Sequence, residues 1–190
     1  LAEKIWTTLG IVPLPLERAQ VEKSYTQSAE AYELYLIGRF QMTRRTPEEL
    51  RRAISTFAAA LKIDGNFAPA YVSIADAYAL LQLYDIQPPE DSYKLAKQYA
   101  ERALEIDENL PEGHATVAYL KFYADRDREA AELEFRRSLQ LNPSNAQTHH
   151  WFALFFSATG KHAEAIEEIE SAKRIDPGSL SVLAAAGMVY

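Results

Sequence analysis

Residues 146–179 read AQTHHWFALFFSATGKHAEAIEEIESAKRIDPGS, and this stretch of 34 residues carries landmarks that recur along the chain. Its first half places large apolar side chains around Ala153, and its second half places small or branched apolar residues every three or four positions. That spacing predicts two amphipathic helices, and Pro177 ends the second because proline cannot continue the helical hydrogen bonds. A repeat of this length predicts antiparallel helix pairs stacked side by side.

The same landmarks define further units. A small residue follows a large one by four positions in each first helix, at Gly38, Ala75, Ala118, Ala153 and Gly187. Each second helix ends on a similar phrase: LKIDG at 61–65, LEIDE at 104–108, LQLNP at 139–143 and KRIDP at 173–177. Small residues at fixed positions let neighbouring helices approach closely. The alignment predicts units at about 31–67, 68–110, 111–145 and 146–179 and a partial unit at 180–190, preceded by an N-terminal helix and linker at 1–27.

This pattern resembles the tetratricopeptide repeat family from about Ala31 to Tyr190. The unit at 146–179 matches best, through Ala165, Ala172 and Pro177, although Ile169 stands where an aromatic residue is usual. The first two units carry insertions around 44–47 and 83–91. The resemblance implies an all-α, right-handed solenoid of antiparallel helix pairs, with about four full repeats and a truncated fifth.

Composition excludes several classes of function. The net charge of −7 argues against a nucleic-acid surface, and the absence of cysteine removes thiolate metal sites and thiol nucleophiles. No apolar run is long enough for a membrane span. His114 and His149 occupy packing positions and His150 diverges from His149 around the helix, so their spacing does not suit a metal. With no Gly-flanked serine elbow either, we expect no catalytic, cofactor or metal site, and no enzyme.

The resemblance also implies a binding groove. In this family the first helix of each pair forms the concave face. The corresponding positions here are mostly aromatic with scattered charges: Tyr32, Tyr35, Arg39, Val72, Asp76, Tyr119, Phe122, Tyr123, His150 and Leu154. Such a surface suits an apolar or amphipathic segment of a protein partner. Chaperone-binding members hold a C-terminal carboxylate with Lys and Asn where this chain has Tyr35 and Arg39, so that ligand is not expected.

Aromatic side chains in a helix array also form its core. We predict core positions for Phe57, Tyr78, Phe135 and Phe152, and leave Tyr35, Tyr119 and Tyr123 evenly divided between ligand contact and core. The sequence contains one basic cluster, made of Arg39, Arg44, Arg45, Arg51 and Arg52. We interpret it as a solvated turn neutralised by neighbouring glutamates, in preference to a site for an acidic peptide or a phosphate group. Arg39 differs, because its position in the first helix aims it at the concave face.

The phrase AYELYLIGR at 31–39 is similar to the opening of repeat regions in large bacterial signalling and transcriptional regulatory proteins. That similarity implies a scaffold within a longer parent protein, in the bacterial cytoplasm or on the periplasmic side of a membrane-anchored parent. Because both ends of the chain fall inside helical patterns, we expect a piece of that parent. The alternative function is self-association through the helix at 180–190, where we expect Leu183, Val189 and Tyr190 to be exposed.

Overall fold

The computed structural model describes residues 25–83 and 89–190, and the regular structure in these ranges is helical. The helices are α3 (Ala29–Thr43), α4 (Pro47–Ile63), α5 (Ala68–Leu83), α6 (Pro89–Ile106), α7 (Pro111–Tyr123), α8 (Arg128–Leu141), α9 (Ala146–Ala158), α10 (His162–Ile175) and α11 (Leu180–Val189). The N-terminal helix expected within 1–27 falls on residues outside the described ranges, as does most of the insertion expected at 83–91. The all-α solenoid of helix pairs is confirmed.

The helix boundaries follow from local hydrogen bonds that the sequence supplies. Thr46 caps α4 by accepting a hydrogen bond from the Glu49 amide at 3.3 Å, and Pro47 takes the first helical position. At the end of α4, the Asp64 carboxylate accepts from the Asn66 amide at 3.0 Å and closes a tight turn. Asp107 and Asn142 make the corresponding bonds after α6 and α8, so the recurring phrase ends one helix and begins the next unit.

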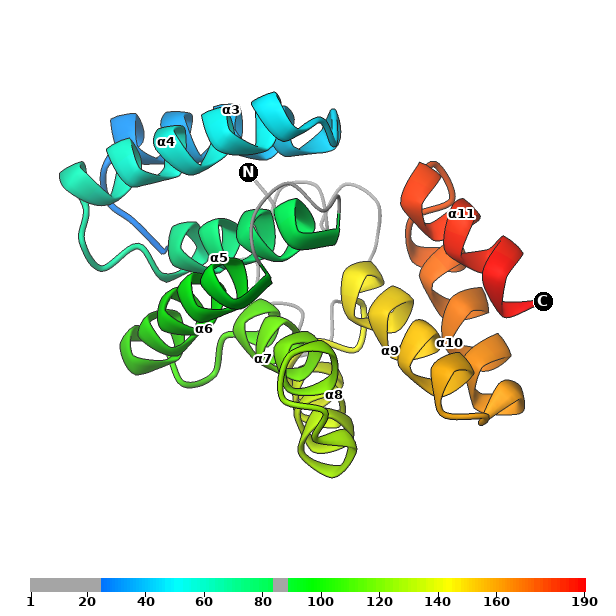
Figure 1. Ribbon diagram of the computed structural model, residues 1–190. Coiled ribbons are helices and arrows are strands. Elements are labelled where there is room, and N and C mark those ends of the chain that lie inside the picture. The colour runs from blue at the N-terminus through cyan, green and yellow to red at the C-terminus, as the bar shows by residue number, and fades with distance from the viewer. Residues whose placement is uncertain (1–24, 84–88) are drawn as a thin grey trace, which may run out of the picture.

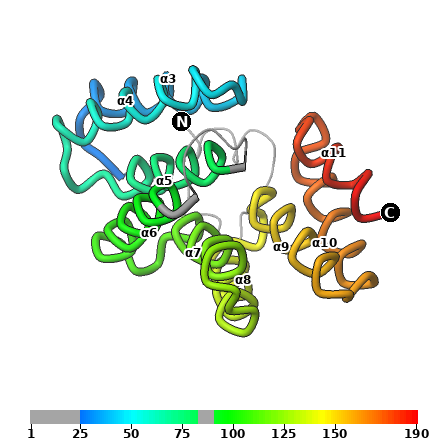
Figure 2. The backbone as a smooth tube through the Cα atoms, in the orientation of Figure 1, coloured from blue at the N-terminus to red at the C-terminus, as the bar shows by residue number. Residues whose placement is uncertain are grey.

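Successive helix pairs follow an arc from α3 and α4 at one end to α11 at the other (Figure 1; Figure 2). The core lies between the helices of each pair and between neighbouring pairs. Phe57, Phe135 and Phe152 are buried as predicted, and the last two stack with ring centroids 5.0 Å apart. Tyr78 is half-buried and packs against the core. The interpretation of the basic cluster agrees with the exposed ion pairs from Arg52 to Glu48 and Glu49, at 2.6 and 2.8 Å.

Two histidines join helices in the third and fourth pairs. His114 Nδ1 lies 2.6 Å from Glu134 Oε2, and its Nε2 lies 2.9 Å from the carbonyl oxygen of Glu108. His149 repeats this arrangement with Glu168 at 2.5 Å and the carbonyl oxygen of Pro143 at 2.9 Å. Because both ring nitrogens face acceptors, the doubly protonated imidazolium satisfies the geometry best. We refer to these as the two His–Glu pairs.

One expectation about the last helix is wrong. Leu183 and Tyr190 are exposed, but Val189 is buried in the core cluster that α11 shares with α9 and α10. More of the apolar surface of α11 therefore packs against the preceding helix pair than we expected from the sequence. The large apolar side chains that stay exposed on α11 and at the residue after it are Leu180, Leu183, Met188 and Tyr190.

Candidate functional site

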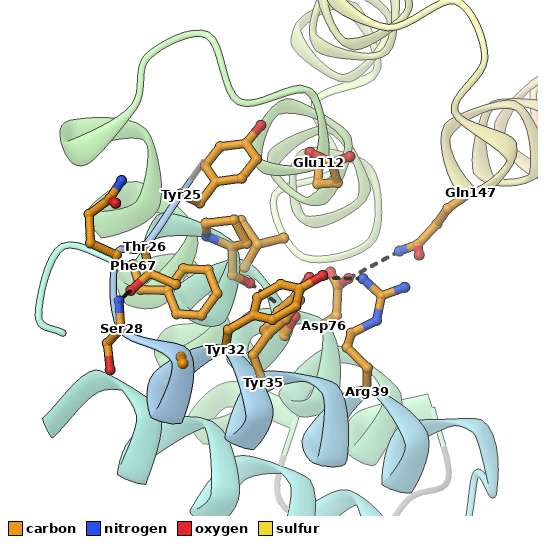
Figure 3. A pocket seen from close by; sticks show the side chains of 15 residues that line it. Tyr25, Thr26, Ser28, Tyr32, Tyr35, Arg39, Phe67, Asp76, Glu112 and Gln147 are labelled. Atoms are coloured by element: carbon orange, nitrogen blue, oxygen red, sulfur yellow. Dashed lines mark hydrogen bonds between the residues drawn. The ribbon is translucent and has the colours of Figure 1, made fainter. Parts of the chain in front are cut away.

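A cavity of about 650 Å³ opens on the inner face of the arc (Figure 3). Its helical residues come from α3, α5, α7 and α9, the first helices of the successive pairs, and the remainder come from residues 25–28 and Phe67. None of the described lining residues belongs to the second helix of a pair. The inner face is thus built from side chains of four units. We call this space the groove cavity.

Asp76 of α5 places a buried carboxylate at the wall of the groove cavity. Only 8% of the residue is exposed, and its oxygens accept hydrogen bonds from Thr116 Oγ1 at 2.7 Å and Gln147 Nε2 at 3.0 Å (Figure 3). Burial raises the pKa of Asp76 to about 6, although the two hydrogen bonds oppose that shift. The carboxylate therefore links three successive units through neutral donors and is charged at neutral pH.

The α3 side of the cavity combines aromatic rings with a guanidinium group. Tyr35 packs against Phe67, with ring centroids 5.0 Å apart, and its hydroxyl accepts a hydrogen bond from Arg39 Nη1 at 3.1 Å. The Arg39 guanidinium also lies 5.9 Å from the centre of the Tyr35 ring. Tyr32 stacks beside Tyr35 with centroids 6.3 Å apart and leaves 51% of its surface exposed. This wall offers ring faces and a polar edge to a ligand.

Glu112 of α7 supplies a second carboxylate to the lining, and its Oε1 accepts a hydrogen bond from Asn145 Nδ2 at 3.3 Å. Tyr25, just before α3, completes the same region. Burial first, and then the negative charge of Glu112, raise the pKa of the Tyr25 hydroxyl above its usual value. The Tyr25 hydroxyl therefore remains neutral at any physiological pH.

Five of the ten residues proposed for the groove line the cavity: Tyr32, Tyr35, Arg39, Val72 and Asp76. The other five lie along α7 and α9 and do not line it: Tyr119, Phe122, Tyr123, His150 and Leu154.

This second group packs mainly within the protein. Tyr119 is 8% exposed, and its ring centroid lies 4.4 Å from that of Tyr123 and 5.0 Å from that of Trp151. Phe122 is buried edge-on against Phe155. Burial, followed by the nearby charge of Arg45, lowers the pKa of His150 to about 4 and keeps its ring neutral.

The cavity also contains residues that were not among the proposed ten. Pro69, Glu112 and Gln147 each stand second in their predicted unit, as Tyr32 does in the first, so the alignment contains a signal for them. Phe67 was missed, yet Leu110 stands in the same register before the next first helix and is also fully buried. Tyr25 and its neighbours up to Ala29 were missed, most of them because 1–27 was interpreted as linker. Ser28 caps α3 by accepting a hydrogen bond from the Ala31 amide at 3.2 Å. A serine at this position was the sequence feature that could have shown that the ordered array begins before residue 28.

Comparison with known proteins identifies the class. The tetratricopeptide repeat model matches residues 146–179. A tetratricopeptide-repeat protein of Thermus thermophilus superposes with a TM-score of 0.68 at 16% identity, over 92% of this chain and 87% of that one. PilF of Pseudomonas aeruginosa gives a TM-score of 0.58 at 22% identity, over 85% and 68% of the two chains. The resemblance to tetratricopeptide repeats is therefore confirmed: residues 146–179 match the repeat in sequence, and the array has its fold.

Curated relatives add a context. The transcriptional regulator HilA of Salmonella typhimurium is 22% identical over 154 residues, which is 81% of this chain but 28% of the regulator. Superkiller protein 3 of Schizosaccharomyces pombe is 28% identical over 208 residues, covering this chain fully and 14% of that protein. This chain thus spans well under a third of either relative. The tetratricopeptide-repeat fold that this chain shares is a scaffold for protein–protein interactions.

Two further observations bear on the site. Within residues 25–83 and 89–190, no three histidine, aspartate or glutamate side chains come together as they would around a metal ion. Among the helices that the structure describes, none is long and apolar enough to cross a membrane.

Proposed function

We propose that this array holds a segment of a partner protein in the groove cavity, as the interaction module of a larger bacterial transcriptional regulatory protein. The observation that carries the proposal is the cavity itself, because four successive units each contribute to its wall. A space of about 650 Å³ accommodates several side chains of a bound segment. The similarity to a transcriptional regulator supports the proposed regulatory context. The proposed binding chemistry is argued from the residues of this chain alone.

The exposed aromatic surface favours an apolar or amphipathic segment. Tyr32 and Tyr35 present adjacent rings, and Val72 of α5, which is almost fully buried, also borders the cavity. Aromatic side chains bury a large area at a small cost in conformational entropy, so they serve well as anchors for a partner.

Selection from a random dodecapeptide library on the immobilised chain tests the proposal. We expect the chain to enrich a set of peptides, and Tyr32→Ala to lower their affinity by roughly tenfold or more, as for an interface anchor. Phe40→Ala is the matched control, because Phe40 is a 62% exposed aromatic residue of the same helix outside the cavity. Equal losses in both variants, or a loss only in Phe40→Ala, would place binding elsewhere and overturn the groove assignment.

A second function, self-association, is favoured by one observation on α11. Leu180, Met188 and Tyr190 expose 81%, 66% and 68% of their surfaces, and a side chain added at Gly187 would meet open space. Sedimentation across a concentration series tests this candidate. If α11 associates, Met188→Ser shifts the chain toward monomer and Leu133→Ser, an equally exposed site on α8, does not. A monomer at all concentrations refutes it.

A further inference from the structure

We infer that the groove cavity selects a partner segment that carries a basic side chain, lysine or arginine, whose charged group lies against Asp76 and Glu112. The inference rests on the proposed function and adds to it the chemistry of the ligand. Its premise is an imbalance of charge inside the cavity.

The imbalance begins with Asp76. A buried carboxylate is normally paired with a cation, because removing a charge from water is costly. Among the described residues Asp76 forms no ion pair, and its two hydrogen-bond donors, Thr116 and Gln147, are neutral. The two donors hold the carboxylate in place without neutralising its charge, and the nearby charge of Arg39 offsets only part of the effect of burial on its pKa.

The rest of the lining preserves this imbalance. Of the lining residues that the structure describes, Asp76 and Glu112 are acidic and Arg39 alone is basic. Arg39 is exposed and its guanidinium contacts the hydroxyl and the ring of Tyr35, while its charge acts on Asp76 and Glu112 without forming an ion pair with either. Water screens an exposed charge more effectively than a buried one, and the two carboxylates outnumber the one guanidinium, so the described lining carries an excess of negative charge.

The aromatic wall suits the same ligand. Lysine and arginine carry apolar stems that pack on rings while their charged ends reach a polar partner. Ring faces attract such cations directly, and Tyr32 and Tyr35 lie on the α3 wall facing the carboxylates of α5 and α7 (Figure 3). An acidic segment would instead meet Asp76 and Glu112 with like charge in a partly desolvated space.

The experiment compares peptide selection by the unaltered chain, by Asp76→Asn and by Glu129→Gln. Asparagine keeps the shape of Asp76 and still accepts from Thr116, while Gln147 can turn its amide oxygen toward the new amide. Glu129, exposed at the start of α8, is the control that removes one negative charge outside the cavity. We expect lysine or arginine to be enriched at one peptide position by the unaltered chain and by Glu129→Gln, and not by Asp76→Asn.

A selected peptide then gives the magnitude. Replacing its basic residue by norleucine should weaken binding to the unaltered chain by at least about tenfold, as expected when a hydrogen bond to a charged group is lost. The same replacement should change binding to Asp76→Asn by less than about threefold. Thermal unfolding of each variant shows that it is folded.

The outcomes separate the two proposals. Enriched peptides that depend on Tyr32 but show no preference for a basic residue leave the groove function standing and overturn this inference. Enrichment of acidic peptides overturns it equally. Selection that is indifferent to Tyr32, or no selection at all, counts against the groove function itself.

Discussion

Gly38 and Gly187 occupy the same position in two first helices, and replacing each by alanine should have opposite effects on stability. A Cβ atom built on Gly38 would lie 2.5 Å from Cε1 of Phe57, and two further ring carbons would lie 2.8 Å away. A Cβ atom on Gly187 would meet nothing within 4 Å. Both glycines lie in α-helices at the same position of the repeat. Comparing the stability of the two alanine variants therefore isolates the effect of side-chain packing.

The magnitudes follow from two terms. Alanine improves helix propensity over glycine by about 1 kcal/mol, and overpacking a filled core costs about 1–3 kcal/mol. Phe57 is fully buried against Ile74 and Tyr35 and cannot withdraw its ring, which places Gly38→Ala at the upper end of the overpacking range. We expect Gly38→Ala to lower the free energy of unfolding by about 2 kcal/mol and Gly187→Ala to raise it by about 0.5 kcal/mol, since Gly187 lies near the helix end.

Urea unfolding followed by circular dichroism measures both changes. For a chain of this size, a loss of about 2 kcal/mol lowers the melting temperature by about 4–8 °C. Gly38→Ala combined with Phe57→Leu should cost less than the sum of the two single changes, because the smaller side chain makes room. A Gly38→Ala protein as stable as Gly187→Ala would show that the first pair is packed more loosely than described, and would refute the reasoning.

Three further predictions concern hydrogen bonds and charge. In the two His–Glu pairs burial disfavours the charged rings, but the hydrogen bonds to glutamate and backbone outweigh it and raise both pKa values. The stability that the pairs contribute is complete below the unfolded pKa, about 6.5, and is lost as pH rises through the folded values, so the free energy of unfolding should fall above pH 6.5. Replacing both histidines by glutamine should flatten that slope in urea unfolding from pH 6 to 9. Because burial raises the pKa of Asp76 from 3.8 to about 6, Asp76→Asn should increase stability at pH 8 by up to about 3 kcal/mol, a gain that vanishes near pH 4. Ser138→Ala should cost about 1–3 kcal/mol, since its buried hydroxyl donates to the Pro111 carbonyl at 2.8 Å, whereas Ser55→Ala on an exposed face should change stability little.

The repeat pattern predicted the fold because periodic features determine it. Small residues at fixed positions, capped helix starts and the Asp or Asn turn each act locally, and each recurs. The register of first helices also indicated which residues face inward in the first two units, and Asp76 and Arg39 do line the cavity. These are properties that one unit shares with the next.

The remainder of the site depends on contacts between distant units, and no local pattern encodes these. Gln147 reaches Asp76 across 71 residues of sequence, and Thr116 reaches it across 40. Tyr119 occupies a groove position in register, yet Trp151 and Tyr123 pack against it and leave it buried. Whether an inward position contacts a ligand or a neighbouring ring depends on how closely two units approach, and side-chain volumes on both decide that distance.

We expect the charge of Asp76 to lower the stability of the fold and to favour the binding of a basic segment. A purely structural role would make Asp76→Asn destabilising, because the carboxylate accepts bonds from α7 and α9. Its raised pKa indicates the reverse, because burial makes the charged carboxylate less stable in the folded chain than in water. At neutral pH Asp76 is nevertheless mostly charged, so this cost is present. A variant that becomes more stable while losing its preference for basic peptides would assign the buried charge to recognition. A variant that loses stability and keeps the preference would assign it to the framework.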